Sequence, residues 1–449
     1  MSEWRETIMG ELMKVEHGFA FKGEYFSESG ELVVLTPGNF HETGGFRLRP
    51  DKDHFYQGKF PDRYLLRKND LIVAMTEQGE GLLGSSALIP ESGKYLHNQR
   101  IGLVRPRKNK TDTTFLYYLF NTDYVRQQIR NSSAGAKIRH TSPERIYRTK
   151  VRIPSQNCQT KIAAILSAYD ELIENNKRRI ALLEKLAEEI YREWFVRLRF
   201  PSHEAVRTVK GVPADWSVKR FHEIVECYIG GGWGEDNEST TFSDGAFVIR
   251  GTDIPHVQIG AFDECPFRYH KTSNLKSRKL KAADFVFEVS GGSKDQLLGR
   301  NVLVTESILK HLKAPVIPAS FCKLIRFRQD LASPYFMKYF LKLYYDYDLV
   351  GIFQVQSTGI SNYQFESFLK FQTVILPSEK LRDAFEEKIK PILELKDSIS
   401  LLNIRLRKTR DLLVPRLISG KLPVENLDIQ FPPGMLEKLS QTSDLTHHA

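Results

Sequence analysis

Apolar residues after Pro154 recur with the spacing of a long amphipathic helix. From Ile162 to Trp194 they are separated by alternating steps of four and three residues, and no glycine or proline falls between Ser155 and Pro201. Such a repeat is typical of a helix that packs along one seam against another helix. The seam positions are Ile162, Leu166, Tyr169, Ile173, Asn176, Ile180, Leu183, Ala187, Ile190 and Trp194.

A second seam follows Pro391, and Pro415 and Gly420 are expected to end its helix. Two seams in one chain predict that the helices pair with each other, and the return of the chain favours an antiparallel pair. Asn176 is expected to set the register, because a buried amide penalises wrong alignments; a cavity, a partner protein or pairing between two copies of the chain are the alternatives. The second seam consists of Ile392, Leu395, Ile399, Leu402, Leu406, Thr409 and Leu413.

The rest of the chain alternates short apolar runs with Gly, Pro and Asn, which predicts two strand-rich domains. These domains repeat one another: residues 70–84 resemble residues 284–299, with an Asp, an apolar run, a small-residue loop and Leu-Leu-Gly in each. Other matched pairs, at offsets of 212 to 223 residues, are Trp4 and Trp216, Val104-Arg105 and Ile325-Arg326, and Ile153-Pro154-Ser155 and Leu376-Pro377-Ser378. The domains contain the expected helical pieces Phe115–Ile129 and Tyr335–Leu341.

These patterns predict an α+β architecture with an internal two-fold repeat, in which two long antiparallel coiled-coil helices join two strand-rich domains. The expected ranges are 1–155 for the first domain, 156–204 for the central helix, 205–377 for the second domain, 378–425 for the C-terminal helix and 426–449 for a tail.

The composition excludes several classes of protein. The 449 residues are 41% hydrophobic and 27% charged, which is ordinary for a globular protein. No apolar run approaches the length of a membrane span and the first residues lack a signal-peptide core, so we expect a cytoplasmic protein. Four cysteines without a CxxC pair argue against a disulfide framework and a zinc site.

The net charge of +10 is unevenly distributed. Residues 94–152 carry fourteen basic and three acidic side chains, and residues 268–281 carry six basic and no acidic ones, whereas the helix 156–200 is close to neutral. Basic stretches in both domains favour one polyanion bound by both, since each phosphate contact releases a counterion.

Polar loops at equivalent places in the two domains could read bases, because Asn, Gln, Arg, Lys and Ser can bond base edges. Residues 76–79 with 98–100 match 290–296, and residues 134–141 match 354–362. The candidate DNA-binding residues, from these loops and the basic stretches, are Gln78, Gln99, Arg100, Arg105, Arg107, Lys108, Lys137, Arg139, Lys276, Arg278, Ser293, Lys294, Gln296, Gln354, Gln356, Ser361 and Asn362.

No motif of a self-contained enzyme is complete. Gly230–Gly234 does not form a GxGxxG fingerprint, and neither Ser92-Gly93-Lys94 nor Ser419-Gly420-Lys421 completes a phosphate-binding loop. HExxH, GxSxG and the Asn-Pro-Pro-Tyr tract of amino-methyltransferases are absent from the sequence. We therefore expect no catalytic residue, metal site or bound cofactor on this chain.

Two long tracts connect the sequence with a known family. The central tract is Ile153-Pro154 followed by residues 159–180 and 183–195, and the C-terminal tract is Thr409 to Leu422. Over essentially the full length, the chain resembles the specificity subunit of type I restriction-modification systems. It departs from the family where Cys158, in place of a frequent Glu, precedes Gln159, and where Glu379-Lys380-Leu381 lacks the corresponding Gln.

The resemblance implies two target recognition domains, 1–155 and 205–377, each reading one half of a bipartite, asymmetric sequence in double-stranded DNA. The helices would fix the spacer between the halves and dock two modification subunits, which bind S-adenosylmethionine and methylate adenine. Two restriction subunits, with ATP and Mg²⁺, would complete a bacterial or archaeal phage-defence complex around this non-catalytic chain. The alternatives are a DNA-binding scaffold without a methyltransferase partner and an enzyme with an unrecognised site.

Overall fold

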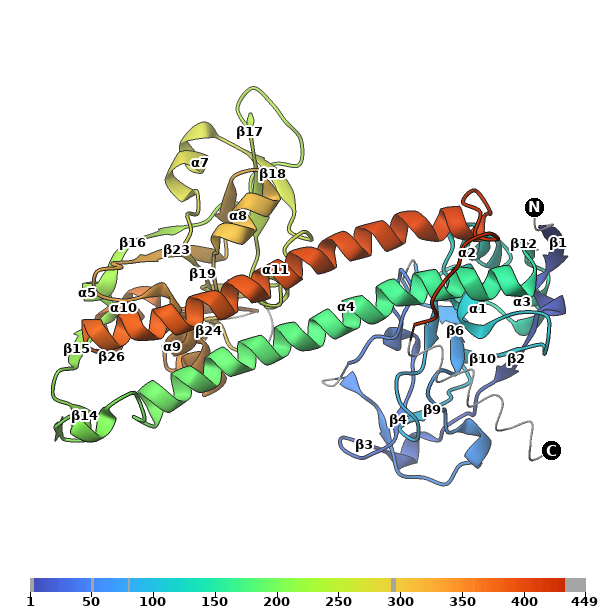
Figure 1. Ribbon diagram of the computed structural model, residues 1–449, viewed down its shortest axis with the longest axis horizontal. Helices are drawn as coiled ribbons and strands as arrows, with labels where there is room; N and C mark the ends of the chain where they lie inside the picture. Colours follow the sequence, from blue (N-terminus) through green and yellow to red (C-terminus); the bar gives the residue numbers. More distant parts are fainter. Residues whose placement is uncertain (1–3, 50–51, 80, 292–295, 358, 433–449) are drawn as a thin grey trace. The chain divides into compact units, whose positions relative to one another are not determined.

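The computed structural model describes residues 4–49, 52–79, 81–291, 296–357 and 359–432. The chain divides into two compact units, one formed by Met1–Leu172 with Arg407–Ala449 and the other by Ile173–Leu406. The long helices α4 (Gln156–Tyr191) and α11 (Glu379–Ile418) each contribute to both units (Figure 1). The helical segments expected as a separate spacer are thus shared between the units, because their apolar faces complete the core of each.

The first unit is built on an antiparallel sheet of four strands in the order β2-β10-β6-β8. All four residues of β6 are buried, as expected of a strand that is covered on both faces. A second sheet has the order β3-β5-β4-β9, and β1 pairs with β12. The strands are β1 (Arg5–Ile8), β2 (Met13–His17), β3 (Phe26–Ser27), β4 (Val33–Val34), β5 (Phe55–Tyr56), β6 (Leu71–Ala74), β7 (Thr76–Glu77), β8 (Ser86–Leu88), β9 (Tyr95–Leu96), β10 (Ile101–Pro106), β11 (Arg139–His140) and β12 (Lys150–Ile153).

The helical piece expected over 115–129 is two helices, α1 (Thr113–Phe120) and α2 (Asp123–Asn131), and α3 (Pro143–Tyr147) follows them. Asn121 ends α1, because its side chain turns to the neighbouring strand: Oδ1 accepts a 3.0 Å hydrogen bond from Ser86 N. Its Nδ2 donates to the carbonyl oxygen of Tyr117 at 3.0 Å. Apolar periodicity cannot reveal such a polar break, since the apolar positions continue through it.

The second unit repeats the main strand order as β16-β23-β19-β21, and β15 pairs with β26 as β1 pairs with β12. In place of the expected piece 335–341, the second unit has one longer helix, α9 (Pro334–Asp346). The other helices are α5 (Phe221–Ile224), α6 (Ile254–Gln258), α7 (Thr272–Arg278), α8 (Glu306–Leu312) and α10 (Phe365–Phe371). The strands are β13 (Thr208–Val209), β14 (Val212–Pro213), β15 (Ser217–Arg220), β16 (Val225–Gly230), β17 (Asp244–Ile249), β18 (Phe267–His270), β19 (Phe285–Glu288), β20 (Ser290–Gly291), β21 (Asn301–Leu303), β22 (Val316–Pro318), β23 (Cys322–Phe327), β24 (Gln354–Ser357), β25 (Ile360–Tyr363) and β26 (Thr373–Leu376).

An aspartate–arginine pair occurs at the same place in both main sheets. In the first unit Arg105 on β10 donates to Asp70 at 2.6 Å. In the second, Arg326 on β23 donates to both carboxylate oxygens of Asp284 at 2.7 Å. Each carboxylate also accepts from the backbone N–H three residues earlier, so it closes the turn that leads into the central strand.

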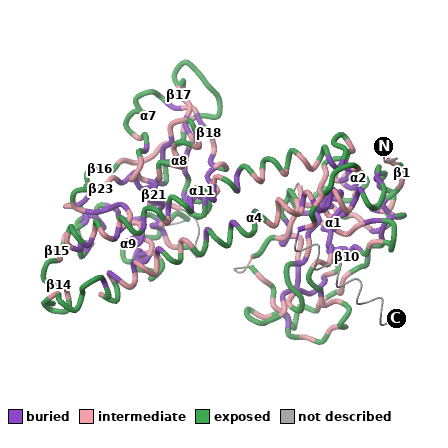
Figure 2. Tube along the Cα trace, in the orientation of Figure 1, coloured by how far each residue is buried: buried purple, intermediate pink, exposed green. Residues whose placement is uncertain are grey.

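Buried residues concentrate inside each unit and along one side of the long helices (Figure 2). Seven residues of the first predicted seam are buried: Ile162, Leu166, Ile173, Asn176, Ile180, Ala187 and Trp194. Tyr169, Leu183 and Ile190 are half-buried. A short π-helix, Arg192–Val196, follows α4 and places Trp194 in the core of the second unit.

The second seam runs through other residues than those expected. Helix α11 begins at Glu379, twelve residues before Pro391, and continues through Pro391 and Pro415. Leu395 and Leu402 are each 47% exposed, and Ile392, Leu406 and Leu413 are half-buried, whereas Ile399 is buried. The buried stripe is Leu381, Phe385, Ile389, Leu393, Lys396, Ser400, Asn403 and Ile404. Starting the pattern at the proline displaced it by about one position, which on a helix turns a buried residue into an exposed one.

Four polar side chains fix the helix contact inside the second unit. Asn176 Nδ2 donates to Asn403 Oδ1 at 2.9 Å, and Asn403 Nδ2 donates to the carbonyl oxygen of Ile173 at 3.2 Å. Further along, Lys396 donates to Glu184 at 2.9 Å, so residue numbers rise on one helix as they fall on the other. The helix segments of this unit are therefore antiparallel.

Glu184 lies between one buried and one half-buried lysine. It pairs with Lys338 of α9 and with Lys396 of α11. Burial alone would raise its pKa, but the two ammonium groups lower the pKa of Glu184 to about 2. Burial lowers the pKa of Lys338 to about 8, although Glu184 favours its charged form. The carboxylate is thus ionised at neutral pH and links α4 to two other helices.

The amide pair gives a first testable prediction. Replacing Asn176 by Ala leaves the carbonyl of a buried amide without its donor, so we expect a loss of about 1–3 kcal/mol of unfolding free energy. Replacing both Asn176 and Asn403 by Leu removes both polar groups and should restore most of that loss. Urea unfolding of the single and double variants measures the coupling. Additive losses in the double variant would contradict a direct pair.

Candidate nucleic-acid interface

In the first unit the predicted reading loops converge through a small ladder. Strand β7 pairs with β11, so that Glu77 lies opposite Arg139 and Thr76 opposite His140. Thr76 Oγ1 and His140 Nδ1 are 3.1 Å apart. Met75 N donates to the carbonyl oxygen of Arg100 at 3.1 Å, which attaches the third loop. We call residues 76–79, 98–100 and 134–141 the first loop cluster.

The second unit contains the same arrangement. Strand β20 pairs with β25, and β25 pairs with β24, so that residues 290–291 meet residues 360–363, which in turn meet residues 354–357. Val289 N donates to the carbonyl oxygen of Phe321 at 2.9 Å, as Met75 does to Arg100. We call residues 290–291, 296, 319–321, 354–357 and 359–362 the second loop cluster. Its middle segment, Ala319-Ser320-Phe321, was missed by the sequence pattern, because it shares no side-chain type with Asn98-Gln99-Arg100.

A close backbone approach supports this correspondence. A Cβ atom on Gly18 would lie 2.1 Å from the carbonyl oxygen of Asn98, and one on Gly231 would lie 2.2 Å from that of Ala319. Only glycine fits at either position, since real Cβ contacts are never this short. The matched glycines therefore indicate that residues 98–100 and 319–321 hold equivalent places.

Most of the candidate side chains on these clusters are available to a ligand. Arg139 is half-buried, and Ser293 and Lys294 lie outside the described residues. The exposed candidates on the two clusters are Gln78, Gln99, Arg100, Lys137, Gln296, Gln356 and Asn362, and Lys276 is exposed on α7.

Other candidates hold the fold instead. Gln354 accepts a 2.9 Å hydrogen bond from Leu298 N, and Arg278 donates to the carbonyl oxygen of Gly230 at 2.9 Å. Ser361 is 4% exposed, so it does not present its hydroxyl to DNA. Arg105 is paired with Asp70, and Glu77 in the reading loop is 3% exposed and accepts from three backbone N–H groups of residues 81–83. A sequence pattern shows residue type but not these partners.

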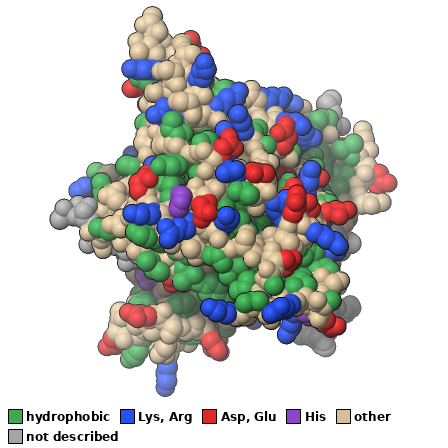
Figure 3. Space-filling model, turned by 90° about the vertical axis from the view of Figure 1, so that its left-hand side faces the viewer, with side chains coloured by type: hydrophobic (Ala, Val, Ile, Leu, Met, Phe, Trp, Pro, Cys, Tyr) green, Lys and Arg blue, Asp and Glu red, His purple; other side chains and the backbone are tan. Residues whose placement is uncertain are grey.

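The basic stretch 94–152 does not form one patch. Lys94 pairs with Glu91, and Arg105 with Asp70 and Glu16. Arg100 precedes β10 and Arg107 follows it, so about 23 Å of extended strand separates them. In the second unit, which Figure 3 views from the end that carries β14 and β15, basic side chains likewise alternate with acidic and apolar ones.

This separation makes a testable distinction. We expect the double variant Arg100→Ala, Lys137→Ala to reduce the slope of log affinity against log salt by about 1–2, since each lost phosphate contact removes about 0.9. Arg107→Ala with Lys108→Ala is the matched control and should leave the slope unchanged, because those residues lie at the other end of β10. Titrations of DNA between about 50 and 200 mM salt measure both slopes. Equal losses would contradict the assignment of the first loop cluster.

A turn in each unit was also missed, and the turn of the second unit lies beside its cluster. Thr36 N donates to Asn39 Oδ1 at 2.9 Å, and Arg250 N donates to Asp253 Oδ2 at 2.9 Å. Both turns follow a strand, β4 or β17, that pairs in parallel with β9 or β22. The repeat offset of 214 residues would have aligned them, although only the Asn/Asp position keeps its chemistry.

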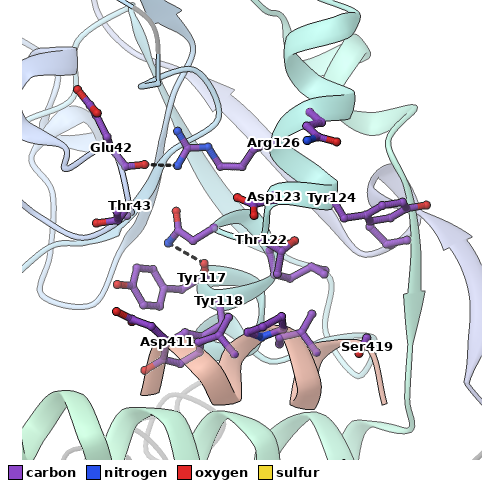
Figure 4. A pocket seen from close by; sticks show the side chains of 18 of the residues that line it. Glu42, Thr43, Tyr117, Tyr118, Thr122, Asp123, Tyr124, Arg126, Asp411 and Ser419 are labelled. Carbon is purple, nitrogen blue, oxygen red and sulfur yellow. Dashed lines mark hydrogen bonds between the residues drawn. The ribbon is translucent and has the colours of Figure 1, made fainter. Parts of the chain in front are cut away.

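The first unit also contains a cavity of about 1100 Å³ on its helical side. It is lined by α1, α2 and the last turns of α11, and Figure 4 shows Arg126 donating to the carbonyl oxygen of Glu42 on its wall. Tyr118 donates to Asp170 at 2.5 Å, and burial together with that carboxylate raises the pKa of Tyr118 well above its usual value. None of the residues chosen from the sequence as DNA-binding lines this cavity.

The described residues do not bring together the side chains that a metal site or a reactive thiol would need. No cluster of three or more His, Cys, Asp and Glu side chains there could hold a metal ion. Burial raises the pKa of the Cys265 and Cys322 thiols to about 12, so neither is a nucleophile at neutral pH. No described helix combines the length and the apolar character that crossing a membrane requires.

Comparison with known proteins defines the class. Residues 1–185 match the family described as "Type I restriction modification DNA specificity domain". The chain is 24% identical to the MjaIX specificity subunit of Methanocaldococcus jannaschii, with 71% of each chain covered. It is 22% identical to the HindI specificity subunit of Haemophilus influenzae, with 94% of this chain and 100% of the relative covered.

A solved structure has the same fold. The crystal structure of the type I restriction-modification S subunit from M. genitalium superposes with a TM-score of 0.57 at 14% identity, covering 93% of this chain and 96% of that one. Residues 1–185 thus match the specificity-domain family, and the chain as a whole is similar to type I restriction-modification specificity subunits.

Proposed function

We propose that this chain selects the DNA target of a type I restriction-modification complex, each unit reading one half of a bipartite, asymmetric sequence. The observation that carries the proposal is the recurrence of one loop cluster, with the same backbone hydrogen bonds, in both units. Exposed Gln, Asn, Arg and Lys side chains differ between the two clusters, as two different half-sites require.

The long helices are proposed to set the unread spacer. Their 36 and 40 residues correspond to about 54 and 60 Å of helix, compared with about 34–36 Å for one turn of B-DNA. The buried amide and ion pairs between them oppose sliding, and a fixed register is what a constant spacer length needs.

The exposed leucines on these helices are the proposed docking residues for modification subunits. In the second unit they are Leu182, Leu186, Leu395 and Leu402, which are 47% to 65% exposed. Leu395 and Leu402 are therefore better placed to contact a partner subunit than to pack between the two helices. S-adenosylmethionine is proposed to bind the modification subunits, and ATP and Mg²⁺ the restriction subunits, with no catalytic step on this chain.

The test is methylome sequencing of a host that carries this chain together with the modification subunits of its own system. We expect adenine methylation at one bipartite sequence, lost when the gene for this chain is deleted. A chain that binds DNA but never co-purifies with a methyltransferase would instead be a scaffold. Methyl transfer by the purified chain alone would indicate an enzyme.

A further inference from the structure

A cavity of about 500 Å³ opens beside the second loop cluster. Its wall combines the turn after β17 with strand β20 and the segment 319–321, so it lies where three separate parts of the chain meet. Its polar and aromatic lining includes Arg250, Thr252, Ser290, Gln296, Ser320 and Phe321.

Arg250 is held in a fixed orientation in this wall. Its Nε donates to Asp253 Oδ2 at 2.9 Å and its Nη2 to Oδ1 at 2.7 Å. The Asp253 side chain is 11% exposed and that of Arg250 is 44% exposed, so the carboxylate is buried behind the guanidinium. A guanidinium has five N–H donors, and these two bonds leave three for a ligand.

The charges of the described residues around the cavity balance. Arg250 is neutralised by Asp253, and Arg300 is neutralised by Glu288, which accepts from it at 2.5 and 2.8 Å. A phosphate site gains its affinity from net positive charge. A wall with oriented donors and no net charge suits the neutral acceptors of a base edge better, and a guanine presents two such acceptors, O6 and N7, in the major groove.

We propose that Arg250 reads a guanine in the half-site of the second unit, with Asp253 as its positioning residue. This inference rests on the proposed function. In the equivalent turn of the first unit, Asn39 accepts the closing hydrogen bond as Asp253 does in the second. Thr36 stands there in place of the arginine. One turn thus supplies a fork-shaped donor in one unit and a single hydroxyl in the other, which gives the two halves of the target different sequences.

The experiment uses the full chain with its modification subunits. The wild-type methylome defines the target, and a chain with residues 205–377 exchanged identifies the half that the second unit reads. Arg250→Ala and Arg250→Lys are then compared, since Lys keeps the charge but loses the fork. Arg328→Ala is the matched control, because Arg328 is also a half-exposed arginine near a carboxylate but lies outside the cavity.

We expect both Arg250 variants to relax one guanine position of that half by roughly tenfold to a hundredfold in discrimination, with the other half unchanged. Asp253→Asn should relax the same position less. An unchanged motif, or relaxation in the other half, would overturn the inference while leaving the proposed function intact. Absence of any methylated motif in the wild type would instead refute the proposed function.

Loss of all methylation in Arg250→Ala is resolved by competition binding. Duplexes of the wild-type target, each changed at one base pair, compete for the variant complex, and its thermal unfolding is compared with the wild type. Retained folding with lost preference at one guanine supports the inference. A uniform loss of affinity for every duplex overturns it, since that is the signature of a phosphate contact or a structural role.

Discussion

Replacing residues 1–154 by the corresponding part of a relative is expected to change one half of the methylated sequence and leave the other half unchanged. The physical reason is that this part of the chain closes on itself. In the first unit β1 pairs with β12, so that Arg5 lies opposite Ile153, and the two ends of the domain leave the sheet side by side. The loop cluster that we assign to DNA lies entirely between these ends.

The exchange must keep one contact at the junction. Gln159, at the start of α4, is 1% exposed and donates to the carbonyl oxygens of Lys110 and Pro154 at 3.3 and 3.1 Å. The donor should come from a relative in which this position is Gln or Arg. Arginine is suitable because Arg382, at the equivalent position of α11, donates to the carbonyl oxygen of Asp330 at 2.6 Å. The Gln missing from the second half is thus replaced by another donor.

Methylome sequencing of hosts with wild-type, first-exchange and second-exchange chains gives the result. The control is the exchange of residues 216–377, which are closed in the same way by the pairing of Ser217 with Leu376. It should change the opposite half. A target that stays the same after the first exchange, or that changes in both halves, would refute independent reading by the two units.

Replacing Asp284 by Ala is expected to destabilise the second unit by about 3–5 kcal/mol, the usual loss when one partner of a buried ion pair is removed. The side chain of Asp284 is 1% exposed and that of Arg326 is 18% exposed, so the arginine would be left charged in a nearly dry site. A guanidinium keeps its proton in proteins, so Arg326 cannot escape by losing its charge when Asp284 is removed.

The repeat supplies a matched control. Asp70→Ala removes the equivalent carboxylate of the first unit, but Arg105 is 45% exposed and water can replace its partner. We expect a loss of about 1 kcal/mol there, as for an exposed pair. Trp194, Trp216 and Trp233 lie in the second unit and only Trp4 in the first. Tryptophan fluorescence during urea unfolding therefore follows Asp284→Ala, and far-ultraviolet circular dichroism, which reports on both units, follows Asp70→Ala. Equal shifts for both variants would contradict the burial argument.

The sequence pattern predicted the long helices and located the matched tracts, because both depend on local spacing. It also singled out Asn176, whose partner Asn403 could not be predicted, since the second seam was started at Pro391 and missed that position. A proline in a helix removes one hydrogen bond, but the apolar stripe on both sides of Pro391 keeps α11 continuous.

The candidate interface was predicted only in outline. The loops were found from their residue types, and the ladders β7–β11 and β20–β25 that join them depend on contacts between residues far apart in the chain. The sequence showed that Arg105 and Arg326 occupy matching positions. Their ion pairs with Asp70 and Asp284, which the sequence did not show, give them a structural role in the sheet. Arg250 was missed because its turn shares only one polar position with its counterpart.

The division of the long helices between the units has a consequence for synthesis of the chain. The second unit is one continuous stretch, Ile173–Leu406, whereas the core of the first also needs Leu417, Ile418 and Val424. At about 5–20 residues per second, the ribosome takes roughly 13–50 s to pass from the end of the first stretch to Val424. The unit that is made first is therefore completed last, and its apolar helix face stays uncovered during that interval.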